Sequence, residues 1–233
     1  MMEPTRLIRI DDYPYGKPQY DRDFCRKTIV RVCELLNAFG VKYMIGVIPF
    51  ETLEEDAKVI RAHLSPFGSV CMHGFDHGFS MKDMWANITQ TWPHGGEFIN
   101  YSVSDFSAKY KNANLRMIEL FGGVYDERHF IAPFNTYTQA VLDALQPTPV
   151  TKMHTCDKEY FAYKYSELDH GNITPVISQF QKTYDYADKV IHNLDNNSQI
   201  TLHWMFDSMR KGWEQHYTNL GRVLRERTDK IGN

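Results

Sequence analysis

The sequence predicts an α/β barrel of parallel βα units, in a single domain that spans residues 1–233. Strand-like and helix-like runs alternate along the chain, with about seven strand-like runs, and this alternation is typical of parallel βα units. A chain of 233 residues suits one barrel or one large α/β domain. Acids and histidines follow several strand-like runs, as expected of barrels with active sites at the carboxyl ends of their strands. An open, doubly wound sheet is the alternative, although no G-x-G-x-x-G follows the first strand.

The elements can be assigned in order from hydrophobic spacing. A strand at 6–11 is followed by a helix at 21–40, where apolar residues repeat at helical spacing, Asp21 can cap the start and Gly40 the end. Further strands are expected at 43–50, 69–74, 128–134, 148–154, 173–178 and 199–206. Further helices are expected at 51–64, 102–123, 137–145, 181–194 and 213–228. The long connection from 78 to 102 is either a binding loop or a packed excursion with one short helix.

Composition excludes several classes of protein. Hydrophobic residues make up 42% and charged residues 24%, which is ordinary for a globular protein with a real core. The net charge is -3 and no basic run is present, so a nucleic-acid partner is not expected. No apolar run approaches the roughly 20 residues of a membrane helix. No signal segment is visible at the start, so a cytoplasmic location is expected. The four cysteines form no C-x-x-C pair, and buried free thiols are expected rather than a zinc knuckle.

Polar side chains gather where the expected strands end. Taken singly, each has a simpler explanation: an aspartate pair is typical of a turn or helix cap, and a histidine in an apolar strand is typical of a hydrogen-bonded core. Their coincidence at strand ends favours one shared site at the rim of the barrel. These residues are Asp11 and Asp12, His73 and His77, Pro133 to Asn135, His154 and Asp157, and His203 with Asp207.

With these residues, the chain resembles the polysaccharide deacetylases of the NodB-homology type, carbohydrate esterase family 4. The fold of that family is a distorted (β/α)7-type barrel. "RIDD" matches its first motif, which implies that Asp11 is the general base and Asp12 a metal ligand. "HGFDH" matches the second motif and implies His73 and His77 as the other ligands. "ITLH" matches the last and implies His203 as the general acid.

The resemblance also implies a function. The backbone N–H of Phe134 would stabilise the oxyanion, and the enzyme would remove an acetyl group from an amino sugar or polysaccharide. The alternatives are a related C–N hydrolase acting on a small non-sugar amide, and a non-catalytic relative that binds metal or glycan.

Two departures from the family pattern concern the surroundings of the site. Gly74 stands where the second motif has Ser or Thr, a form that divergent branches carry. Ile131 stands where the third motif has the arginine that holds the base. Arg9 is the preferred replacement, because it lies two residues before Asp11 and so leaves a strand on the same face. Lys152 and Arg128 are the other candidates.

The residue types suit a hydrolytic metal. One carboxylate and two imidazoles leave positions open for water and substrate, the arrangement expected of catalytic zinc. Zn²⁺ is therefore the expected ion, with Fe, Co, Ni or Mn as alternatives, since no thiolate forces the choice. Asp11 and Asp12 would point to opposite faces of a straight strand, so the strand must break at this pair.

Overall fold

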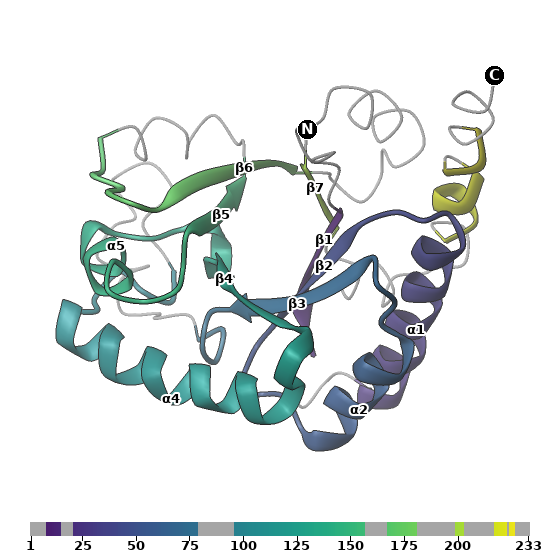
Figure 1. The fold of residues 1–233 in the computed structure, drawn as a ribbon, viewed down its shortest axis with the longest axis horizontal. Helices are drawn as coiled ribbons and strands as arrows, with labels where there is room; N and C mark the ends of the chain where they lie inside the picture. Colours follow the sequence, from purple (N-terminus) through teal and green to yellow (C-terminus); the bar gives the residue numbers. More distant parts are fainter. Residues whose placement is uncertain are drawn as a thin grey trace. The chain divides into compact units, whose positions relative to one another are not determined.

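The computed structural model describes residues 8–14, 21–78, 96–156, 167–180, 199–202, 217–222 and 224–226. Within these residues, strands β1 to β7 follow one another in sequence order around a closed barrel (Figure 1). The pairs β1–β7, β4–β5 and β5–β6 are parallel, as βα units require. The predicted barrel is confirmed, and the open doubly wound sheet is wrong.

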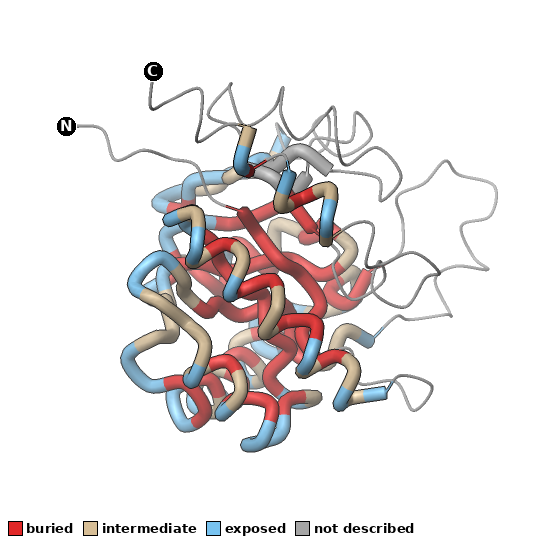
Figure 2. The backbone as a smooth tube through the Cα atoms, turned by 90° about the vertical axis from the view of Figure 1, so that its right-hand side faces the viewer, coloured by how far each residue is buried: buried red, intermediate tan, exposed pale blue. Residues whose placement is uncertain are grey.

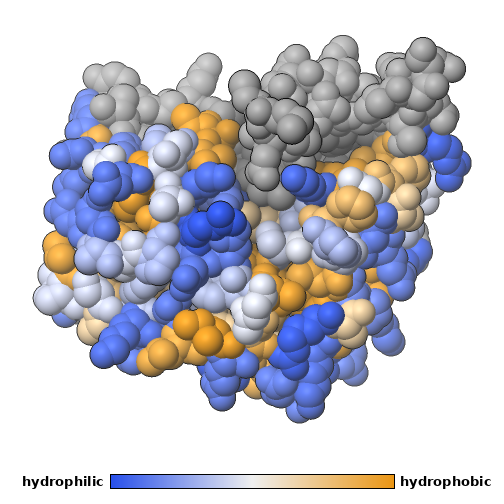
Figure 3. Space-filling model, in the orientation of Figure 1, coloured by the Kyte–Doolittle hydropathy of each residue, from blue (hydrophilic) through white to orange (hydrophobic). Residues whose placement is uncertain are grey.

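Internal contacts divide the chain into two compact units. The first comprises Met1–Gly46, Glu51–Val70 and Gln179–Asn233, and the second comprises Val47–Phe50 and Cys71–Ser178. Buried residues concentrate in the strands and on one side of each helix (Figure 2). On the face shown in Figure 3, hydrophobic patches are interrupted by hydrophilic side chains.

The first unit holds the start of the barrel. β1 (Ile8–Tyr13) pairs with β7 (Gln199–Leu202), and Ile10 lies beside Leu202. α1 (Arg22–Ala38) begins after Asp21, whose carboxylate accepts from the backbone N–H groups of the first turn. Gly40 follows the helix with a φ of 61°, a conformation that favours glycine. The predicted caps of this helix are therefore confirmed.

A buried carboxylate ties together the helices of the first unit. β2 (Tyr43–Val47) leads to α2 (Glu54–His63), which contacts α1. Asp56 of α2 is fully buried and accepts from Arg22 and Arg26 of α1, each at 2.7 Å. Two guanidinium groups compensate this carboxylate, as a buried charge requires.

The second unit is organised around aromatic side chains. Its elements are β3 (Gly68–His73, from Cys71 on), α4 (Val103–Phe121), β4 (Tyr125–Ile131), α5 (Gln139–Leu145), β5 (Lys152–Cys156) and β6 (Thr174–Phe180, as far as Ser178). A short 3₁₀ turn lies at Gly122–Val124, and a tight turn lies at Pro133–Asn135. Phe75, Phe98, Phe106 and Phe130 are fully buried, with ring centroids 5.0 to 6.3 Å apart. Because Phe75 lies two residues after the end of β3, this cluster anchors the chain just beyond that strand.

Most of the expected elements are present with shifted ends. The strand expected at 128–134 is β4, which ends at Ile131, and the strand expected at 148–154 is β5, which begins at Lys152. The last expected helix is described only at 217–222 and 224–226, where the chain is helical. The helix expected at 181–194 lies outside the described residues. Cys25, Cys33 and Cys71 are buried free thiols, as predicted. None of the described helices is long and apolar enough to cross a membrane.

Candidate metal centre and its surroundings

The first strand, β1, contains a buried ion pair. Arg9 donates from Nη2 to Oδ2 of Asp11 over 2.8 Å, and the side chains are 0% and 1% exposed. The two residues are two positions apart in β1, so both side chains leave on the same face. The predicted cation beside Asp11 is therefore Arg9. The other two candidates lie elsewhere: Arg128 pairs with Asp126, and Lys152 is exposed.

Asp12 is placed by an unusual backbone conformation. β1 runs on to Tyr13, so the strand does not end at the aspartates as predicted. Instead Asp12 has a φ of 68°, in the left-handed region that few non-glycine residues adopt. This residue interrupts the regular alternation of the strand, which removes the geometric objection to neighbouring aspartates sharing one site. The Asp12 side chain is buried.

His73 and His77 flank a tight turn after β3. His73 is the last residue of the strand and is buried, whereas His77 is partly exposed. Gly74 and His77 have φ values of 64° and 50°. The two imidazole centroids lie 5.1 Å apart. The turn thus brings both rings together, as the four-residue spacing predicted.

Asp12, His73 and His77 have the chemistry of a divalent-metal site. Each offers one ligand atom, and these atoms lie within 4.8 Å of one another. Among the described residues, no other group of three or more histidines, cysteines and acids has its ligand atoms this close together. Two imidazoles and one carboxylate fit Zn²⁺ and its neighbours in the transition series.

Glu97 lies against the histidine turn, and no motif or spacing in the sequence points to it. Its buried carboxylate accepts from three consecutive backbone N–H groups, those of Phe75 at 2.9 Å, Asp76 at 3.3 Å and His77 at 3.1 Å. Burial, and then the neighbouring Asp76 carboxylate, raise the pKa of Glu97 to about 7. An acid 20 or more residues along the chain carries no local signal for this role.

The segment after β4 turns sharply beside His77. Phe134 and Asn135 have φ values of 55° and 54°, two consecutive left-handed residues without a glycine. The Phe134 ring centroid lies 4.5 Å from that of His77. A strained turn of this kind is common at functional sites, where surrounding contacts hold it. Ile131, at the position of the family arginine, is fully buried in β4.

No protein-family model matches this sequence, and no curated protein matches it either. Solved structures do match in fold. A Mycobacterium smegmatis protein assigned to the polysaccharide deacetylases has a TM-score of 0.59 at 12% identity, covering 94% of this chain and 84% of its own. A family 4 acetyl xylan esterase from Clostridium thermocellum, solved with a cobalt ion, has a TM-score of 0.54 at 14% identity, covering 95% of this chain and 83% of its own.

A third match is a mutant of a CE4 family pseudoenzyme from Bacillus anthracis with restored enzymatic activity. It has a TM-score of 0.54 at 12% identity, covering 95% of this chain and 63% of its own. This chain has the fold of the family 4 carbohydrate esterases. At these identities the likeness establishes the fold alone, and the chemistry must be argued from the side chains.

Of the other expected residues in this fold, His154 pairs with a histidine from the neighbouring strand. His129 Nδ1 and His154 Nε2 are 2.7 Å apart, both residues are buried, and the rings are stacked. Burial lowers the pKa of His129 to about 4, which favours the neutral ring. His203, Asp157 and Asp207 lie outside the described residues.

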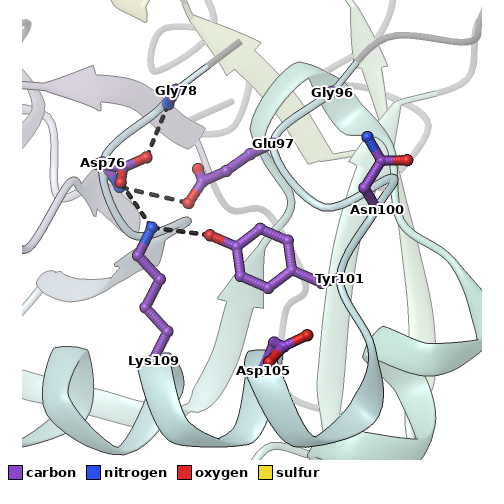
Figure 4. Close-up of a pocket in the computed structure, with 8 residues that line it drawn as sticks. All are labelled: Asp76, Gly78, Gly96, Glu97, Asn100, Tyr101, Asp105 and Lys109. Atoms are coloured by element: carbon purple, nitrogen blue, oxygen red, sulfur yellow. Dashed lines mark hydrogen bonds and ion pairs between the residues drawn. The ribbon is translucent and has the colours of Figure 1, made fainter. Parts of the chain in front are cut away.

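A polar cavity of about 470 Å³ adjoins the histidine turn. Lys109 of α4 points into it and donates to Asp76 at 2.7 Å and to the Tyr101 hydroxyl at 2.8 Å (Figure 4). The lining residues are Asp76, Gly78, Gly96, Glu97, Asn100, Tyr101, Asp105 and Lys109. This volume lies within the usual range of small-ligand pockets, and the lining offers both donors and acceptors.

Proposed function

We propose that this chain is a metal-dependent hydrolase that removes an acyl group, acetyl in the first instance, from an amino sugar or polysaccharide. The observation that carries the proposal is the donor set of Asp12, His73 and His77, one ligand atom from each within 4.8 Å of the others. Three protein ligands leave positions for water and substrate. The likeness in fold to carbohydrate esterases agrees with a hydrolytic reaction.

The other residues of the proposed site supply the general base, the oxyanion donor and the general acid. A divalent ion bound there would supply Lewis acidity and lower the pKa of a bound water towards ~7. Asp11 accepts the proton of the attacking water, and Arg9 holds the Asp11 carboxylate in place over 2.8 Å. The backbone N–H of Phe134, in its left-handed turn, donates to the developing oxyanion. By resemblance to the family, His203 protonates the leaving amine.

A carbohydrate is favoured over a small apolar amide by the polar cavity beside the turn. Sugar hydroxyl groups both donate and accept hydrogen bonds, and the cavity offers an ion pair, an amide and a phenol. Zn²⁺ is the proposed ion, and Fe, Co, Ni or Mn would suit the same donors.

Elemental analysis of purified variants tests the ligand set. Asp12→Ala, His73→Ala and His77→Ala should each lose the bound divalent ion. His63→Ala is the control: this histidine lies at the end of α2 and bonds the Val59 carbonyl, so metal should stay. Undiminished metal in all three ligand variants would contradict the proposed site.

Acetate release from N-acetylglucosamine oligomers and from acetylated xylan tests the reaction. The wild type should release acetate, and Asp11→Asn should keep the metal while losing ~10² to 10⁴-fold in rate. Turnover of a small non-sugar amide alone would identify a different C–N hydrolase. Bound metal without any turnover would identify a non-catalytic relative.

A further inference from the structure

A buried carboxylate accepts hydrogen bonds along the turn between the two histidines. The two carboxylate oxygens of Glu97 accept hydrogen bonds from three backbone N–H groups. Oε1 accepts from Phe75 and Asp76, and Oε2 accepts from His77. Glu97 is only 7% exposed, so it is itself fixed by the packing around it. Because one of these N–H groups belongs to His77, the carboxylate acts directly on the backbone that carries that imidazole.

We propose that Glu97 is the positioning residue of the histidine turn, fixing the backbone from Gly74 to His77 so that His73 and His77 face the same ion. This inference rests on the proposed function, since it assumes that the two histidines bind metal. Outer partners that orient metal ligands typically contribute 10- to 100-fold in metal affinity.

Gly74, the first residue of the turn, is packed against the Glu97 carboxylate. Its φ of 64° favours glycine, and a Cβ atom at this position would collide with the Glu97 carboxylate and with Pro133. A Ser or Thr, which the related motif has here, would therefore displace Pro133 or the Glu97 carboxylate. Glycine at this position fits both the left-handed backbone and the space that Pro133 and Glu97 leave.

Lys109 braces the same turn from α4. Its ammonium donates to Asp76, whose other carboxylate oxygen accepts from the backbone N–H of Gly78 (Figure 4). This pair is about one-third exposed, so it contributes less than the buried Glu97. The turn is thus held at three backbone amides by Glu97 and at one side chain by Lys109.

The test compares Glu97→Ala and Glu97→Gln with Asp56→Asn. Asp56 is a matched control, because it is also a buried carboxylate with several donors but serves the helices of the first unit. Metal dissociation constants are measured by chelator competition with Zn²⁺ on folded protein. Hydrogen exchange of the amides of Phe75, Asp76 and His77 is measured on the metal-free protein, which gives a readout independent of activity.

Glu97→Ala should raise the dissociation constant for Zn²⁺ by ~10- to 100-fold and speed exchange at the three amides. Glu97→Gln keeps one acceptor oxygen, so the dissociation constant for Zn²⁺ should rise by less than in Glu97→Ala. This variant should also fold if the alanine variant does not. Asp56→Asn should lower stability without changing the metal constant. Unchanged affinity in both Glu97 variants would overturn the inference alone, whereas a wild type that binds no divalent metal would overturn the proposed function as well.

Discussion

Arg9 and Asp11 are two opposite charges removed from water, each at most 1% exposed and 2.8 Å apart. Removing one partner of such a pair typically costs about 3–5 kcal/mol, because the other charge stays buried without its counter-charge. We therefore expect Arg9→Met to lower the free energy of unfolding by about this amount, measured by urea denaturation. Acetate release should fall with it, since Asp11 loses the group that orients it.

The double variant Arg9→Met/Asp11→Asn separates the two effects. It removes both charges, so unfolding free energy should recover much of the loss while activity stays low, because the base is absent. A strong coupling energy between the two positions is expected for residues in direct contact. An Arg9→Met protein that is as stable as the wild type would show that the pair is not desolvated.

At the scale of residues, a local rule predicts what lies close in the chain: strand parity predicts Arg9 beside Asp11, and the ion pair is there. The ligand roles of His73 and His77 follow from their places at a strand end and from the family resemblance, and they stay predictions. Glu97 was missed because hydrogen bonds from its carboxylate to the backbone of a distant segment leave no pattern in the sequence. The left-handed conformation of Asp12 has no signal in the sequence either, because only a small minority of aspartates adopt it.

At the scale of elements, β4 shows why boundaries are harder to predict. The apolar run "RHFIAPF" continues to Phe134, yet the strand ends at Ile131. Pro133 lacks an N–H and cannot extend a ladder, and Phe134 and Asn135 then turn through left-handed conformations. The apolar character of Phe134 is explained by its contact with the His77 ring, not by a place in the strand.

His129 of β4, which pairs with His154 of β5, should make the stability of the fold depend on pH. Burial lowers the pKa of His129 from 6.5 to about 4. Above about pH 6.5 the ring is neutral in both folded and unfolded chains, so it adds no pH dependence. Between about pH 6.5 and 4 the unfolded chain binds a proton that the folded chain does not, so stability must fall as the pH falls.

The expected loss across that range is up to about 3 kcal/mol, at ~1.4 kcal/mol for each pKa unit. Urea denaturation at several pH values measures it in the wild type and in His129→Gln. The glutamine variant cannot titrate and should lose this part of the slope. An identical slope in both proteins would assign the acid sensitivity to other groups.

At the scale of the whole molecule, the alternation of strands and helices predicts parallel βα units but leaves an open sheet as the alternative, and the family resemblance favours the seven-stranded barrel that the structure has. The alternation predicts these units because each one must bury its strand under the helix that follows, whatever the exact residues. The same logic cannot say what the rim binds, since loop residues such as Asn100 and Tyr101 obey no period. The assignment to one domain and the role of His203 stay predictions.

The cavity beside the histidine turn allows the substrate class to be tested on the intact protein. Asn100→Trp would place an indole where Asn100 now lines the cavity. If a sugar unit next to the acylated one binds there, kcat/KM for an N-acetylglucosamine oligomer should fall, mostly through KM, because the lost contacts are binding contacts. Hydrolysis of a small aryl acetate should not change, since it reaches only the metal centre. Leu115→Trp, at a 57% exposed position on α4, adds similar bulk away from the cavity and should alter neither rate. Equal losses on both substrates would mean that the indole disturbs the histidine turn, and unchanged rates would place the rest of the sugar chain elsewhere.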